Sequence, residues 1–135
     1  MSAKQIFKVA KIWGQSIFYL TAGLSHLIFS EFYLPLIPDG GLSREMINGL
    51  AGCSEIVLGL MIMIPRTRFG ASYGLIGMLM VYVIVHVRFI LNGGCFDGSL
   101  CLPSWVGWLR LLVIHPLLIL WARSLIYPST PESNV

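Results

Sequence analysis

Three ionisable side chains lie in stretches of the sequence that are otherwise apolar, and their types suit proton transfer. They are His26, Glu55 and Arg110. An ionisable group inside a membrane is costly unless it is paired, so each one suggests a functional site. A carboxylate or an imidazole can take up a proton, while a guanidinium stabilises a developing negative oxygen. We therefore predict His26, Glu55 and Arg110 as catalytic residues.

A second group of polar residues shares helical spacing with these three. Tyr82 and His86 are four residues apart, and Asn48 precedes Glu55 by two helical turns. Residues at such spacing lie on one face of a helix, so we predict Tyr82, His86 and Asn48 as cofactor-binding residues of the same polar pocket. His115 follows Arg110 by five residues, which is about 140° around an α-helix, so we expect the two to point to different centres.

The polar residues also allow simpler interpretations. Interhelical hydrogen bonds from such side chains can merely hold a helix bundle together. His26 and His86 could ligate a haem from two helices, but nothing sets their distance and the chain has no Cys-x-x-Cys-His motif. We therefore do not predict a haem. We predict no metal site either, because His, Cys, Asp and Glu do not cluster at ligand spacing.

Cys95 and Cys101 bracket a short polar segment with the sequence CFDGSLC. The Asp-Gly pair favours a turn, so the two cysteines can meet. We predict a disulfide that holds the shape of this loop; a redox-active pair is the alternative, although five intervening residues are not the spacing of a redox Cys-x-x-Cys motif. Cys53, by contrast, is expected to be a small buried apolar residue.

The elements that must position these residues are long apolar stretches. The chain has 135 residues, of which 56% are hydrophobic and only 11% are charged, whereas soluble domains carry about 25% charged residues. A membrane-spanning helix needs about 20 apolar residues. Four stretches meet that test: 12–29, 46–64, 69–91 and 105–126.

These stretches predict an all-α membrane protein. Backbone polar groups inside a bilayer must be paired within the chain, which favours helices, and no alternation of the kind found in membrane β-barrels is visible. Short connections between the stretches favour antiparallel neighbours. We therefore expect an antiparallel bundle of four transmembrane helices in one domain, residues 1–127, followed by a disordered polar tail, residues 128–135.

Basic residues indicate the orientation of this bundle. Lysine and arginine in short loops mark the cytoplasmic side, and they concentrate at both ends of the chain and between the second and third stretches. We expect a multi-pass protein of the cell inner membrane, with both termini cytoplasmic and the first and third loops periplasmic or extracellular. Membrane lipids and a protein partner or a second copy are the expected partners. The chain has no basic stripe with interleaved aromatic residues, so we expect no nucleic-acid binding.

Three segments resemble the DoxX and DoxX-like family of small four-helix membrane proteins. They are YLTAGLSHLI (Tyr19–Ile28), GLAGCSEIVLGLMIMIPRTRFGASYGLI (Gly49–Ile76) and WLRLLVIHPLLILWA (Trp108–Ala122). The second contains the G-x-x-E-x-x-x-G pattern of that family, and the third contains the arginine that enters its fourth helix. The resemblance implies the four-helix fold and an association with sulfur and quinone redox chemistry.

The leading functional prediction is a quinone-linked redox subunit of an oxidoreductase, with its polar pocket in the outer half of the bundle. One alternative is a non-catalytic subunit that binds a lipid or assists assembly. Another is a small proton-coupled transporter that uses Glu55 as its protonation site, which four helices would achieve only as a dimer.

Overall fold

The fold is all-helical, as the sequence predicts. The structure, a computed structural model, describes residues 1–96 and 101–126, and this part of the chain contains no strand. The predicted tail, residues 128–135, lies outside the described residues. The elements are α1 (Ala3–Ile28), α2 (Ser30–Tyr33), the 3₁₀ helix η1 (Leu34–Leu36), α3 (Arg44–Met63), α4 (Arg68–Leu91), α5 (Ser104–Leu109), the π-helix η2 (Arg110–Ile114) and α6 (His115–Arg123).

Two of the long helices, α1 and α3, begin at a polar side chain that caps them. α1 starts at Ala3, well before the expected Ile12, because Ser2 and Gln5 form a capping box in which each side chain bonds the other residue's backbone N–H. α3 starts after Ser43, whose hydroxyl accepts from the backbone N–H of Met46. The predicted second and third helices are therefore found within two residues of their expected bounds.

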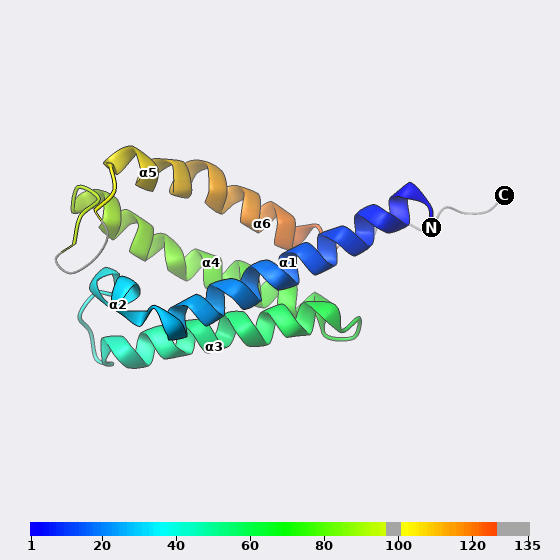
Figure 1. The fold of residues 1–135 in the computed structure, drawn as a ribbon, viewed down its shortest axis with the longest axis horizontal. Coiled ribbons are helices and arrows are strands. Elements are labelled where there is room, and N and C mark those ends of the chain that lie inside the picture. The colour runs from blue at the N-terminus through cyan, green and yellow to red at the C-terminus, as the bar shows by residue number, and fades with distance from the viewer. Residues whose placement is uncertain (97–100, 127–135) are drawn as a thin grey trace.

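The connection after α1 is helical, which the sequence did not predict. The chain bends by 93° between α1 and the segment formed by α2 and η1. This segment lies across the end of the bundle rather than along it (Figure 1). Pro35 lies within η1, where the missing N–H of proline costs nothing because the first turn of a helix has unpaired donors.

Three helical segments of the described chain are long and apolar enough to cross a membrane. They are Arg44–Met63, Arg68–Leu91 and Ser104–Arg123, the last formed by α5, η2 and α6 together. A fourth is obtained if α1 and the bent segment after it are taken as one span. The composition and length of the helices thus agree with the predicted spans.

The four long segments lie side by side and alternate in direction (Figure 1). α1 packs along α3, α3 along α4, and α4 along α5 and α6. α1 also meets α6 where Trp121 Nε1 donates to the Lys11 carbonyl at 3.3 Å and Lys11 Nζ donates to the Ser124 carbonyl at 2.8 Å. We use the name core end for the end of the bundle with this contact and the α3–α4 turn. The opposite end, with α2, η1 and the α4–α5 connection, is the cavity end.

Small residues allow α1 and α3 to approach closely. A Cβ added to Gly23 would lie 2.6 Å from the Gly52 carbonyl oxygen, and one added to Gly52 would lie 2.9 Å from that of Gly23. The Ser16 hydroxyl donates to the Gly59 carbonyl at 2.7 Å. Close approach of helix backbones at small residues is typical of membrane bundles, and here it brings the polar faces of α1 and α3 together.

Candidate functional site

The site is a cavity of about 360 Å³ between α1, α3, α4 and the η2–α6 segment. We call it the central cavity. A second cavity of about 270 Å³, the end cavity, lies beside it and shares Tyr33, Leu36, Val85, His86 and Arg110 with it. The apolar core, by contrast, is formed by Tyr19, Ile62, Ala71, Leu75 and Ala122. Tyr19 belongs to both the core and the wall of the central cavity, and so marks the boundary between them.

His26 and Asn48 form a pair across α1 and α3. Asn48 Nδ2 donates to the His26 carbonyl at 2.7 Å, which turns the amide oxygen toward the imidazole. His26 Nδ1 lies 2.7 Å from Asn48 Oδ1. Because an amide oxygen only accepts, the hydrogen-bonding pattern assigns the proton to Nδ1. Nε2 of His26 is then the nitrogen that faces the cavity and Glu55.

Glu55 is buried on α3, with 4% of its side chain exposed. Its Oε1 lies 3.9 Å from His26 Nε2, which is too long for a direct hydrogen bond. Its Oε2 has no hydrogen-bond partner among the described residues. Oε2 of Glu55 is therefore available to accept a hydrogen bond from a ligand in the cavity.

Two tyrosines complete the surroundings of Glu55. Tyr82 from α4 lies near enough to Glu55 to interact with its carboxyl group as a hydrogen-bond donor, and Tyr19 from α1 interacts with Glu55 electrostatically. Neither hydroxyl makes a hydrogen bond of ordinary geometry within the described part of the chain, although both are buried. The imidazole of His26 lies 6.4 Å from the Tyr82 ring, centroid to centroid. Histidine, carboxylate and phenol groups from three helices therefore meet at one wall of the central cavity.

Arg110 and His115 both line the central cavity, contrary to the expectation that they point to different centres. The helix between them is a π-helix, in which the His115 N–H donates to the Arg110 carbonyl. The 140° estimate assumed α-helical geometry throughout, whereas a π turn adds about one residue per turn and brings residues five apart to the same side. π turns in α-helices often occur at functional sites.

His86 and His115, which both line the central cavity, bond to backbone carbonyls of α4. His86 Nδ1 lies 2.9 Å from the Tyr82 carbonyl, and His115 Nε2 lies 2.6 Å from the Leu79 carbonyl. The two rings are 5.0 Å apart. Each ring nitrogen that faces a carbonyl must carry the proton, so the other nitrogen of each ring is free to accept a hydrogen bond.

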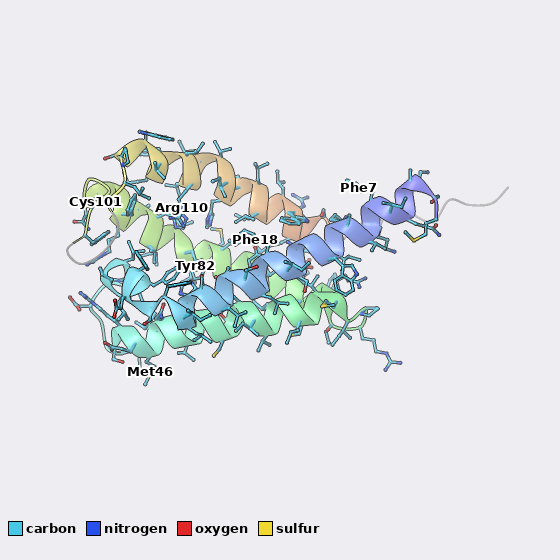
Figure 2. All side chains as sticks on the ribbon, viewed as in Figure 1. Phe7, Phe18, Met46, Tyr82, Cys101 and Arg110 are labelled. Atoms are coloured by element: carbon cyan, nitrogen blue, oxygen red, sulfur yellow. A yellow bond between two sulfur atoms is a disulfide. The ribbon has the colours of Figure 1, made fainter. Side chains whose placement is uncertain are left out.

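The structure brings most, but not all, of the predicted site residues into mutual contact. All six of His26, Asn48, Glu55, Tyr82, His86 and Arg110 lie at or beside the central cavity. Glu55 and Arg110 line the same cavity, yet they do not form an ion pair in the described structure. Figure 2 shows Arg110 and Tyr82 on different helices, at a similar level along the bundle. The cavity thus has a carboxylate region near Glu55 and a cationic region near Arg110.

Tyr33 is a site residue that the sequence analysis missed. Its ring stacks on the His26 imidazole with centroids 3.8 Å apart, and its hydroxyl lies 2.6 Å from the Ser25 hydroxyl. Together with Leu36 and, at the end cavity, Leu102, it closes the cavities at the cavity end. No motif marks these residues, because they reach the site only through the bend after α1 and the return of the chain into α5.

Cys95 and Cys101 are bonded as predicted, with Cα atoms 4.3 Å apart. The Leu102 N–H donates to the Gly94 carbonyl at 2.9 Å and closes the base of the loop. Cys53 is exposed on the outer face of α3, so the expectation that it is buried is wrong. The reason is that Asn48, Gly52, Glu55 and Gly59 take the inner face of that helix.

Comparison with known proteins identifies a family for most of the chain. The family that matches residues 16–126 is described as "Domain of unknown function (DUF8561)". No curated protein matches the chain, and no solved structure does.

The predicted resemblance to the DoxX family is wrong, since the matching family is a different one. The glycines of the first two segments have a role in packing: Gly23 lies next to Gly52, and Gly59 lies against α1, where α1 and α3 approach closely. Such spacing is shared by many unrelated membrane bundles. Because the match covers residues 16–126, the chain belongs to the family of the domain of unknown function DUF8561.

Proposed function

We propose that this protein spans a membrane and binds the head group of a quinone-type molecule in the central cavity, as a quinone-linked redox subunit. The observation that carries the proposal is the buried Glu55 carboxyl group, which has one open oxygen and lies among His26, Tyr19 and Tyr82 in an otherwise apolar cavity. An ionisable group at such a place is a functional site by default.

The orientation that we propose follows the distribution of basic residues. Both termini and the α3–α4 turn, with Arg66 and Arg68, face the cytoplasm, and the α1–α3 and α4–α5 connections face the periplasm or the cell exterior. The protein is then a multi-pass protein of the cell inner membrane, and the central cavity lies in the outer half of the bilayer. The disulfide in the α4–α5 connection fits this assignment, because disulfides persist in oxidising compartments.

The size and lining of the central cavity suit a small ring with polar edges. Its volume of about 360 Å³ falls in the range of small-molecule sites, about 300–1,000 Å³. A quinone carbonyl accepts hydrogen bonds, which the Tyr82 hydroxyl and the Arg110 guanidinium can donate. A quinol hydroxyl donates, and Glu55 and His26 Nε2 can accept. Apolar side chains of α4 and α6 form the remaining walls and can contact an isoprenoid tail.

The residues of the cavity divide the chemistry between them. Glu55 would exchange a proton with the bound ring, and His26, held by Asn48, presents Nε2 at 3.9 Å from the carboxyl group as a second proton acceptor of the cavity. Arg110 would donate hydrogen bonds to an oxygen of the ring and stabilise negative charge there. His86 and Tyr82 orient the ring from α4. The quinone supplies the electron chemistry when it is bound; this chain binds, orients and moves protons.

Substitution of Glu55 tests this function directly. In lipid nanodiscs, Glu55→Gln should weaken the binding of a short-chain quinone about tenfold or more, which corresponds to about 1.4 kcal/mol. The matched control is Glu45→Gln, an exposed glutamate on the same helix, which should bind as the natural protein does. Binding is measured by quenching of tryptophan fluorescence. Equal binding by both variants, or no binding by the natural protein, would contradict the proposal.

A second candidate function is the binding of a membrane lipid without redox chemistry. It is favoured by the lining of the central cavity, most of which is apolar. Glu55 would then be a packing element, and Glu55→Gln would change stability or assembly alone. Lipid that co-purifies equally with the natural protein and the variant, together with an absence of quinone binding, would favour this candidate.

A further inference from the structure

Two polar side chains of α1 lie buried between the central cavity and the core end without a partner. Gln15 has 0% of its surface exposed, and neither its amide nitrogen nor its amide oxygen has a hydrogen-bond partner among the described residues. Tyr19 has 2% exposed, and its hydroxyl likewise lacks a partner there. Neither side chain is explained by the hydrogen bonds that hold the bundle together.

These two residues and Lys11 lie along one line on α1, between Glu55 and the core end. Gln15 and Tyr19 are one helical turn apart on the face of α1 that points into the bundle. Tyr19 lines the central cavity and interacts electrostatically with Glu55. One turn in the other direction, Lys11 is only half-buried and donates to the Ser124 carbonyl at the core end. The line therefore extends from the cavity to the edge of the bundle.

The free-energy cost of this arrangement argues for a role. A buried polar group without a partner costs about 1–3 kcal/mol. Leucine at position 15 and phenylalanine at position 19 would fill similar volumes without that cost. Buried groups of this kind are commonly satisfied by internal water, which makes about three hydrogen bonds to otherwise unpaired groups. An amide with two donors and an acceptor, next to a hydroxyl, can hold such water in a chain.

We propose that Gln15 and Tyr19, bridged by internal water, form a proton path that connects Glu55 with the core end of the bundle. The inference rests on the part of the proposed function that makes Glu55 a proton acceptor; it does not depend on the identity of the ligand. The path gives Glu55 a supply of protons from the side opposite to the cavity end. On the proposed orientation, that side is the cytoplasm.

Three groups face Glu55, and their hydrogen bonds determine which of them can pass a proton to it. From α1 they are His26 and Tyr19, and from α4 Tyr82. His26 Nδ1 is already committed to Asn48, which closes the route behind the imidazole. The hydroxyls of Tyr19 and Tyr82 both lack a partner within the described structure. One turn toward the core end, however, Tyr82 is followed on α4 by Met78, which packs against the apolar core, whereas Tyr19 is followed on α1 by the polar Gln15. Tyr19 is therefore the group through which a proton can reach the Glu55 carboxylate from the core end.

The transfer is balanced for one proton and involves no electron. A proton from the aqueous phase at the core end passes to the water beside Gln15, which gives one of its protons to the Tyr19 oxygen, and the Tyr19 hydroxyl gives its own proton to the Glu55 carboxylate. The new O–H bonds form as the old ones break, and Tyr19 ends as it began after its hydroxyl rotates. Gln15 does not change its protonation; it is a positioning residue that holds the water.

Infrared spectroscopy of the protein in nanodiscs can follow this transfer. The carbonyl band of protonated Glu55 is identified by its loss in Glu55→Gln, and its rate of appearance is recorded after a rapid drop in pH. Gln15→Leu and Tyr19→Phe should each slow the appearance by roughly a hundredfold, the lower end of what a positioned proton-transfer group contributes. The final amplitude of the band should not change.

Two control variants separate proton transfer from structural effects. Thr21→Val removes an exposed hydroxyl of α1 that bonds to the Ile17 carbonyl of its own helix, and the rate should not change. Ser16→Ala removes a buried, satisfied hydroxyl next to Gln15, and it should lower the melting temperature without slowing the band. Gln15→Leu and Tyr19→Phe should melt at or above the temperature of the natural protein, because each removes an unsatisfied polar group.

Each outcome decides the proposal. Slow protonation in stable variants supports the path. Unchanged rates in both variants would overturn it, as would the absence of any Glu55 band over the pH range in which the protein stays folded. If the natural protein binds no quinone, but Gln15→Leu and Tyr19→Phe still slow the protonation of Glu55, the proposed function is overturned and the path stands.

Discussion

At the scale of single residues, Asn48 determines how His26 can act. The asparagine side chain bonds both the carbonyl and the ring of His26, at 2.7 Å each. It thereby sets the orientation of the ring and the nitrogen that carries the proton. The stacked Tyr33 ring holds the imidazole from the other side, with centroids 3.8 Å apart. The same histidine on an isolated helix would have neither restraint.

Replacement of Asn48 tests this role. Asn48→Leu should lower the free energy of unfolding by about 1–3 kcal/mol, because it leaves a buried carbonyl and a ring nitrogen without partners. It should also change the ¹⁵N chemical shifts of the His26 ring, since Nδ1 is no longer held as the donor. Unfolding in detergent and NMR of the labelled histidine measure the two effects. With Glu45→Gln as the control, an unchanged His26 spectrum would contradict the assigned role.

At the scale of elements, the contact between α1 and α3 positions the site. Tyr19 and His26 of α1 reach Asn48 and Glu55 of α3 because glycine and serine at the contact let the two backbones approach. A larger side chain would separate the helices and with them the polar groups. The small residues at the α1–α3 contact therefore also determine the geometry of the candidate site.

Glycine substitutions on α1 and α3 test this contact. Gly23→Ala should destabilise the protein by about 1–3 kcal/mol, the usual cost of overpacking, because its Cβ would lie 2.6 Å from the Gly52 carbonyl oxygen. Gly49→Ala is the matched control on α3, since a Cβ there meets nothing within 4 Å; alanine should even be tolerated better there, given its higher helix propensity. Equal melting temperatures for the two variants would be inconsistent with the packing described.

The π-helix has a similar effect on the other side of the cavity. Without η2, Arg110 and His115 would point in different directions from one regular helix. With it, both line the central cavity, and His115 reaches the Leu79 carbonyl of α4. The position of Pro116 just after the π turn fits this break, because proline cannot donate a backbone hydrogen bond.

At the scale of the whole molecule, the bundle has an apolar core toward one end and two cavities toward the other. The apolar core and the contact between α1 and α6 lie toward the core end, and the two cavities lie toward the end closed by α2, η1 and Leu102. Cys101 lies at this cavity end and Phe7 at the opposite end (Figure 2). This division places the candidate site next to one side of the membrane on the proposed orientation.

Thiol labelling in intact cells tests the orientation. On the proposed topology, a membrane-impermeant maleimide should label Cys95 and Cys101 only after mild reduction, because they are bonded to each other. Cys53 should stay unlabelled, because its outward position on α3 faces lipid. Mass spectrometry reads the three sites separately. Labelling of Cys95 and Cys101 that requires permeabilised cells would reverse the proposed orientation.

The sequence by itself determined the helical class, three of the candidate spans, the disulfide and the residue types of the site. These features depend on local properties: runs of apolar residues long enough for a helix to span, turn residues between cysteines, and polar groups at helical spacing. The family was misjudged from the same local patterns, because glycines such as Gly52 and Gly59 occur wherever two helices pack closely and do not identify a family.

Only the tertiary structure decided which of these residues act together. The π turn that joins Arg110 and His115, the bend that stacks Tyr33 on His26, and the outward position of Cys53 all depend on how whole helices pack. How the helices pack depends on small free-energy differences between contacts of residues far apart in the chain. The spacing of residues within one helix gives no information about these contacts. The sequence could thus name the groups of the cavity, whereas their partners follow from the fold.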